Sequence, residues 1–126
     1  MFAGLILNFT MSKAKALVII MSGSNNPAKV KVGLNMAWGT KNSGAFEDVK
    51  LLFFGPGEDF IAKTDDKEIL EAYGEVLKNN IIPQACVAVA DGFGISAVLQ
   101  EKKVELVRAG QRIAELMAEG YQPITF

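Results

Sequence analysis

The chain contains a single cysteine, Cys86, and no histidine. One thiol cannot form an internal disulfide, a Cys-x-x-Cys redox pair or a cysteine zinc site. Without histidine the chain cannot build a Ser-His-Asp triad, a Cys-His pair or a histidine metal site. The chemistry that remains possible is that of a single nucleophilic sulfur, and we expect no metal and no other cofactor.

The position of Cys86 depends on where the apolar segment before it ends. If this strand ends at Ala85, Cys86 precedes a short helix over residues 87–93. The sulfur then lies at the carboxyl end of a strand, where open α/β sheets have their ligand crevices. If the strand continues to Val89, the sulfur points into a sheet face and is inert. The sequence leaves both boundaries open.

The first boundary favours a reactive thiol. Free N–H groups at Val87 and Ala88 would stabilise the thiolate of Cys86, because helix amino termini favour negative charge. The competing interpretation is structural, since a free cysteine most often packs as a small apolar side chain. A catalytic Cys86 with ligand-binding Val87 and Ala88 is therefore one hypothesis, and a packed Cys86 is the other.

Two glycine-containing turns are further candidate binding positions. Ser24 and Asn25 precede an expected helix and could hold a small anion on its free N–H groups, although ordinary capping explains the same residues. Gly55 begins a Gly-Pro-Gly turn after another expected strand. The carboxylates that follow, Glu58 and Asp59, have no third ligand at a known spacing, so we expect a solvated loop there.

Apolar strands alternate with amphipathic helices along the chain. Strands are expected at residues 16–21, 49–54, within 81–89, 103–107 and 122–126. Helices are expected from Pro27 to about residues 39–44, from residues 65–68 to Asn79, over residues 95–99 as one turn, and from Ala109 to Gly120. This alternation predicts a mainly parallel sheet with helices on both faces. Pro123 is tolerable in the last strand only if that strand lies near an edge.

Composition limits the partners. Half of the 126 residues are hydrophobic, and 13 basic residues face 14 acidic ones, which gives no positive excess for nucleic acid. The apolar run at the amino terminus is too short to span a membrane and lacks a secretory leader. We therefore expect a cytoplasmic protein with an extension over residues 1–10, held by packing, and one domain over residues 11–126.

The chain resembles the DsrE/DsrF-like sulfur-relay family from Lys15 onward. The resemblance is carried by the Phe-Phe-Gly-Pro-Gly turn, by Ile-Pro-Gln-Ala-Cys ending at Cys86, by the Gly94-Ile95 pair, and by Val-Glu-Leu-Val-Arg-Ala-Gly over residues 104–110 leading to Ile113 and Gly120-Tyr121. It implies a three-layer α/β/α domain with five parallel strands, assembly as a homotrimer or homohexamer, and a cysteine at position 86 that carries sulfur as a persulfide.

Two functions from different classes follow. In the first, the protein is a sulfur carrier or sulfurtransferase that accepts sulfane sulfur on Cys86 from a donor protein and passes it to an acceptor thiol. In the second, the protein is a non-enzymatic oligomer that binds a small ligand or a partner through Ser24, Asn25 and the turn at Gly55. Cys86 is structural in the second.

Overall fold

The computed structural model describes residues 14–126. The expected extension over residues 1–10 lies outside this range. The described strands are β1 (Ala14–Ile20), β2 (Phe46–Phe53), β3 (Gln84–Cys86), β4 (Glu105–Val107) and β5 (Tyr121–Thr125). The described helices are α2 (Pro27–Asn42), α3 (Pro56–Lys63), α4 (Lys67–Lys78), α5 (Val87–Phe93), α6 (Ser96–Glu101) and α7 (Ala109–Ala118). None of these helices is long and apolar enough to cross a membrane.

The strands form one parallel sheet in the order β4-β3-β2-β1-β5. This confirms the predicted five-stranded parallel α/β fold. The aliphatic residues of β1 are buried from Ala16 to Ile20, because β1 lies inside the sheet with side chains packed on both faces. β5 is an edge strand, which explains how it accommodates Pro123 without a ladder donor.

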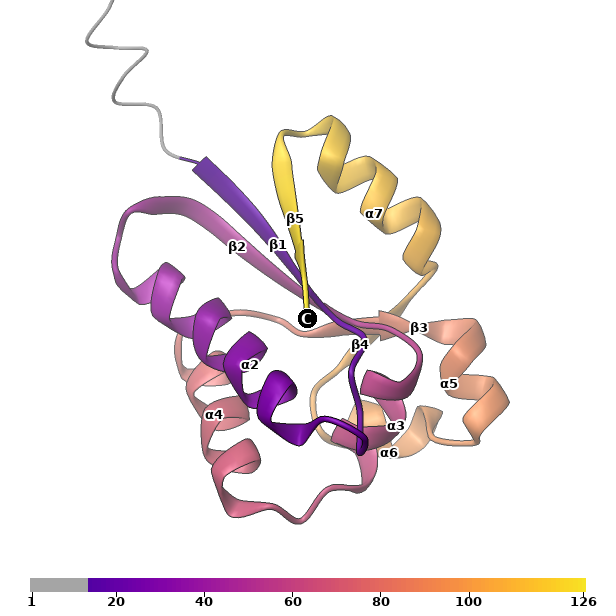
Figure 1. Cartoon of the computed structure of the whole chain (residues 1–126). Coiled ribbons are helices and arrows are strands. Elements are labelled where there is room, and N and C mark those ends of the chain that lie inside the picture. The colour runs from indigo at the N-terminus through magenta and orange to yellow at the C-terminus, as the bar shows by residue number, and fades with distance from the viewer. Residues whose placement is uncertain (1–13) are drawn as a thin grey trace, which may run out of the picture.

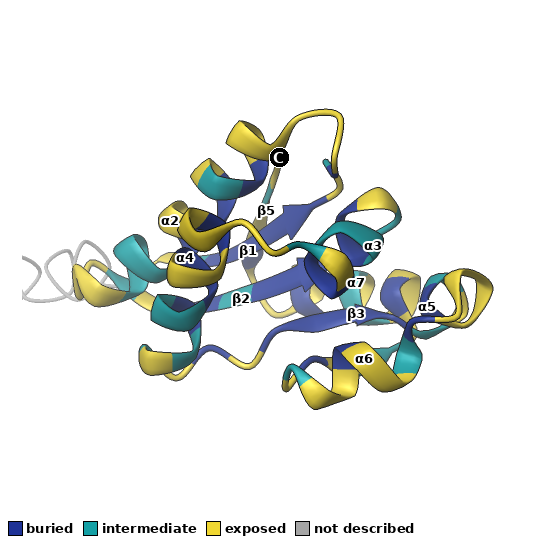
Figure 2. Ribbon diagram, turned by 90° about the horizontal axis from the view of Figure 1, so that it is seen from below, coloured by how far each residue is buried: buried dark blue, intermediate teal, exposed yellow. Residues whose placement is uncertain are grey.

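The helices cover the two faces of the sheet unequally. Residues of α2, α3, α4, α5 and α6 share one hydrophobic cluster with Val18 and Ile20 of β1. On the opposite face, Leu17 and Ile19 pack with residues of α7. Figure 1 shows α7 across the sheet from α2 and α4, and Figure 2 shows the buried strands between them. The α7 side of the sheet is therefore the less covered side.

The segment after β2 differs from the prediction. Glu58 and Asp59 do not lie in a solvated loop, because Pro56–Lys63 forms helix α3. Pro56 occupies the first helical position and Gly55 is the N-cap, an arrangement that suits proline, which has no N–H to leave unpaired. Ile61 and Ala62 bury the helix against the larger core. This helix brings its amino terminus to the carboxyl end of the sheet.

Candidate functional site

Cys86 lies where β3 becomes α5. It is the last residue of the strand and the N-cap of a helix that runs from Val87 to Phe93. The structure thus has the helix at the residues predicted by the first of the two strand boundaries. Gly94 ends this helix with a positive φ of 70°, and the N–H of Ile95 returns to the carbonyl of Ala90 at 3.0 Å. The thiol therefore lies at the junction between a short strand and a short helix with a defined end.

The Cys86 side chain is buried among apolar groups. The residue is 8% exposed, and its cluster contains Leu17, Ile19, Leu52, Ala109, Leu116 and Tyr121. Four further side chains that pack against this cluster are only partly buried, namely Phe54, Val89, Val107 and Ile113. We call these four partly exposed side chains the apolar cover of the cluster that contains Cys86.

The start of helix α5 beside Cys86 stabilises an anionic sulfur only weakly. Val87 is half-buried and Ala88 is exposed, and the Cys86 side chain makes no capping hydrogen bond in the described chain. Without such a bond, the seven-residue helix favours an anionic sulfur only through the partial positive charge of its first turn. A role for Val87 and Ala88 in holding an anionic sulfur stays a prediction.

Glu58 is a candidate that the sequence analysis did not identify. Its side chain is fully buried, at 0% exposure. Oε2 accepts a hydrogen bond from the backbone N–H of Gly55 at 3.1 Å, whereas Oε1 has no hydrogen-bond partner among residues 14–126. Burial raises the pKa of Glu58 to about 7, against the lowering effect of the backbone N–H groups of Gly55 and Cys86. Glu58 is therefore a buried acid next to the backbone of Cys86.

The Gly55-Pro56-Gly57 turn directs Glu58 into the interior. Gly55 has φ 65° and ψ −129°, a conformation that glycine adopts readily and other residues avoid. A Cβ on Gly57 would clash with the carbonyl oxygen of Ile20 and would lie 3.2 Å from that of Ser22. The backbone of α3 therefore lies against the end of β1, and the third helical position, Glu58, points inward.

A separate crevice lies at the carboxyl end of the sheet. It has a volume of about 530 Å³ and is lined by Ser24, Asn25, Pro56, Asp59, Phe60, Lys63, Thr64, Asp65 and Phe93. Two of the predicted binding residues, Ser24 and Asn25, thus come together beside the turn that contains Gly55. Gly55, Val87, Ala88 and Cys86 are not among the lining residues.

Local hydrogen bonds define the wall of this crevice. Asn25 Oδ1 accepts from the N–H of Gly23 at 3.3 Å, so Asn25 closes the turn after β1. Asn26 is the N-cap of α2 and accepts from the N–H of Lys29 at 3.2 Å. Asp59 forms an ion pair with Lys63 at 2.6 Å. Capping explains Asn26, whereas the side chain of Ser24 is exposed at the crevice.

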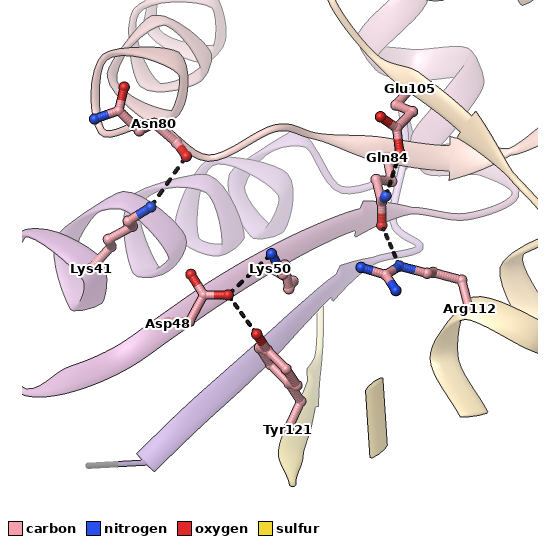
Figure 3. Close-up of polar contacts among 8 residues, drawn as sticks. All are labelled: Lys41, Asp48, Lys50, Asn80, Gln84, Glu105, Arg112 and Tyr121. Atoms are coloured by element: carbon pink, nitrogen blue, oxygen red, sulfur yellow. Dashed lines mark hydrogen bonds and ion pairs between the residues drawn. The ribbon is translucent and has the colours of Figure 1, made fainter. Parts of the chain in front are cut away.

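Polar side chains such as Gln84 and Arg112 lie on the α7 side of the sheet (Figure 3). Gln84 precedes Cys86 by two residues, so both side chains project to the same face. The Gln84 amide nitrogen donates to Glu105 at 2.7 Å, and its oxygen accepts from Arg112 Nε at 3.3 Å. These contacts join β3, β4 and α7 and hold the strand that carries the thiol.

The same polar face continues across β2 to β5. The Tyr121 hydroxyl donates to Asp48 at 2.5 Å, and Lys50 pairs with Asp48 at 3.1 Å. Burial opposes ionisation of Asp48, but the hydrogen bonds from Tyr121 and Lys50 and the charge of Lys50 lower its pKa overall. Burial and the hydrogen bond to Asp48 raise the pKa of Tyr121 to about 12. Asp48 is thus held as an anion that cross-links two strands.

The sequence contained a signal for Glu58 but not for the polar face. The helix start at Glu58 follows a known pattern, with glycine at the N-cap, proline at the first helical position and glutamate at the third. The same residues also read as a Gly-Pro-Gly turn, and the sequence analysis predicted a loop for that reason. Contacts such as Tyr121 to Asp48 join residues 73 positions apart, and no local spacing predicts them.

Comparisons with known proteins agree with this geometry. The model of the DsrE/DsrF-like family matches residues 14–126. A conserved protein of unknown function from Bacteroides thetaiotaomicron superposes with a TM-score of 0.73 at 19% identity, over 89% of this chain and 94% of that one. The ychN protein from E. coli gives 0.66 at 16% identity, over 92% and 100%. No curated protein matches the chain. At these identities the two structures support the fold.

Proposed function

The chain belongs to the DsrE/DsrF-like family, and from this premise we propose that it is a sulfur carrier that holds sulfane sulfur on Cys86. The observation that carries the proposal is the position of Cys86 as the last residue of β3 and the N-cap of α5. A cytoplasmic location, assembly as a homotrimer or homohexamer, and separate donor and acceptor proteins are parts of the same proposal.

The transfer needs no cofactor and no net oxidation. The Cys86 thiolate attacks the outer sulfur of a donor persulfide, R–S–SH, so that a new S–S bond forms and the donor S–S bond breaks. The products are the Cys86 persulfide and the donor thiolate, R–S⁻. An acceptor thiolate then attacks the outer sulfur of Cys86–S–SH, and the Cys86 thiolate leaves. One sulfur atom moves in each step, and the charge is unchanged.

Burial of Cys86 fits a carrier better than an exposed thiol would. Apolar side chains around the sulfur keep a bound persulfide from other thiols, and the partly exposed Val107 and Ile113 belong to the cover. Local opening of packed surface elements costs less free energy than global unfolding. Brief movement of this cover would admit a donor to Cys86.

Treatment with polysulfide is expected to add the mass of one sulfur atom to the wild-type chain and none to Cys86→Ser. The reason is that the described chain contains no second thiol that could hold sulfane sulfur. Intact-protein mass spectrometry measures the addition, and reduction with dithiothreitol should reverse it. Failure of Cys86 to react with polysulfide or with a small alkylating reagent in the folded protein would contradict the proposal.

A second candidate function is ligand binding without sulfur transfer. The observation that favours it is the crevice that brings together Ser24, Asn25 and Pro56. Helix N–H groups near Asn25 suit a small anion, and Cys86 would then be a packing residue.

Thiosulfate is a suitable probe for separating the two functions. If the crevice is the site, thiosulfate shifts the backbone amide resonances of Ser24 and Asn25 in both wild type and Cys86→Ser, and Asn25→Ala weakens the apparent affinity by about tenfold, the loss of one charge-assisted hydrogen bond. NMR titration measures the affinities. An absence of shifts at these amides would remove the second candidate.

A further inference from the structure

A further cavity lies between α7 and the amino-terminal ends of β3 and β4. It has a volume of about 210 Å³ and is lined by Asp48, Val49, Lys50, Asn80, Ile81, Ile82, Gln84, Glu105 and Arg112. These residues come from β2, from the segment before β3, from the first residues of β3 and β4, and from α7. The residues of the crevice and Cys86 do not line it, so neither function proposed above uses this cavity.

The cavity forms where β2 and the chain before β3 separate. The two strands are paired at Gln84 and Ala85 of β3, and the residues before Gln84 are not part of the strand. Residues 48–50 and residues 80–82 therefore line the cavity as separate walls. Ile82 is 64% exposed, so the cavity opens to solvent and a small solute can reach it.

Two cations at this cavity have hydrogen-bond donors that the described chain does not use. An arginine side chain has five N–H donors and a lysine has three. Arg112 donates through Nε to the Gln84 oxygen at 3.3 Å, and its Nη1 lies 3.8 Å from Glu115, which is too far for a hydrogen bond. Among residues 14–126, the Lys50 ammonium has one polar contact, with Asp48 at 3.1 Å. Figure 3 shows the guanidinium group of Arg112 directed toward the side of the cavity that Lys50 occupies.

The two carboxylates at the cavity are already engaged by other groups. Asp48 accepts from the Tyr121 hydroxyl and pairs with Lys50. Glu105 accepts from the Gln84 amide nitrogen at 2.7 Å. The lining has two positive and two negative side chains, so net charge does not decide which ligand fits. The groups that remain available are mainly donors, and such an arrangement favours a ligand that offers acceptors.

We propose that this cavity binds a small organic carboxylate, whose oxygens accept from the terminal nitrogens of Arg112 and from Lys50. The planar guanidinium group matches a carboxylate, because the two can form a pair of parallel hydrogen bonds. Ile82 supplies an apolar contact for the rest of the ligand. The volume is below the range of roughly 300–1,000 Å³ that holds drug-sized ligands, which limits the ligand to a few carbon atoms. Binding does not depend on sulfur transfer by Cys86.

The test is an NMR titration of the full chain with sodium butyrate. In wild type, butyrate should shift the Nε–H resonance of Arg112 and the backbone amide resonances of Gln84 and Ile82. Arg112→Gln should weaken the apparent affinity by about tenfold, because the charge-assisted hydrogen bonds to the carboxylate are lost. Arg108→Gln is the matched control, since Arg108 does not line the cavity, and it should bind butyrate as wild type does.

Three further probes test which part of butyrate is recognised. Butan-1-ol and butylamine keep the short apolar chain but lack the carboxylate, so neither should shift the Arg112 Nε–H resonance. Inorganic phosphate is an anion without the planar shape and should bind more weakly than butyrate. Equal shifts with butan-1-ol would mean that apolar contact alone produces binding, and equal affinity for phosphate would mean a general cationic patch. Either result would overturn the proposal.

A second variant and the wild-type protein cover the case in which Arg112→Gln disturbs the fold. Lys50→Gln removes the other cation from β2 and should also weaken butyrate binding severalfold, whereas the contact of Arg112 with Gln84 stays in place. Cys86→Ser should bind butyrate as wild type does, so failure of sulfur transfer and failure of butyrate binding are separate results. Absence of a shift at Arg112 Nε–H in wild type with tens of millimolar butyrate would overturn the proposal.

Discussion

Replacement of Gly57 by alanine is expected to destabilise the protein by about 3 kcal/mol, near the upper end of the cost of overpacking. The added methyl group would meet the carbonyl oxygen of Ile20 and would lie 3.1 Å from its carbonyl carbon. Both are backbone atoms of a central strand, so neither can rotate away. Relief of the clash requires α3 to move away from β1.

Gly74→Ala is the matched control for this substitution. Gly74 lies within α4, and a Cβ there would have no heavy atom within 4 Å among its described surroundings. Alanine at that position should stabilise the protein by up to about 1 kcal/mol, the difference in helix propensity. Urea unfolding measures both variants. A Gly57→Ala protein as stable as wild type would show that α3 does not lie tightly against the end of β1.

The features predicted correctly from the sequence depend on local patterns. The alternation of apolar strands with amphipathic helices predicted a parallel sheet with helices on both faces, and Pro123 predicted that the last strand lies at an edge. The helix over residues 87–93 is one of the two alternatives that the sequence left open for this segment. Each of these features is determined by residues within a few positions, so periodicity and turn residues contain the necessary information.

The buried acid depends on contacts between distant segments. Glu58 follows a Gly-Pro-Gly turn and precedes another carboxylate, a composition typical of a solvated loop. It is buried because α3 lies against the end of β1, more than 30 residues earlier in the chain. Tertiary packing overrode the local preference, as is common for short segments. The exposed Asp65 is in the environment expected for such a carboxylate, whereas Glu58 is not.

The cover over Cys86 has the same origin. One of the two strand boundaries left open by the sequence places this thiol at the carboxyl end of a strand, and β3 does end there. The residues that bury it include Leu17 near the start of the described chain and Leu116 near its end. Among residues 14–126, the other side chains packed against this cluster come from α5, β4, α7 and the residue after β2. Its accessibility therefore depends on packing that no local spacing reveals.

Glu58→Gln is expected to become more stable relative to wild type as the pH rises. In the unfolded chain a glutamate ionises with a pKa of about 4.3, whereas burial raises the pKa of Glu58 to about 7 in the folded protein. The folded state therefore binds more protons between these values, and wild type loses stability as the pH rises through them. Above about pH 7 both states are ionised, and the loss is complete.

Between about pH 5 and pH 8, the unfolding free energy of Glu58→Gln should rise by about 2 kcal/mol relative to that of wild type, from the size of the shift in the Glu58 pKa. Urea unfolding of wild type and Glu58→Gln at both pH values measures it as the change in their difference in unfolding free energy. Asp59→Asn, which neutralises the adjacent carboxylate in its ion pair with Lys63, should not reproduce the trend. A stability difference between wild type and Glu58→Gln that stays constant with pH would mean that Glu58 is ionised in the folded protein throughout. The carboxyl would then need a compensating cation, which the described chain does not place beside it.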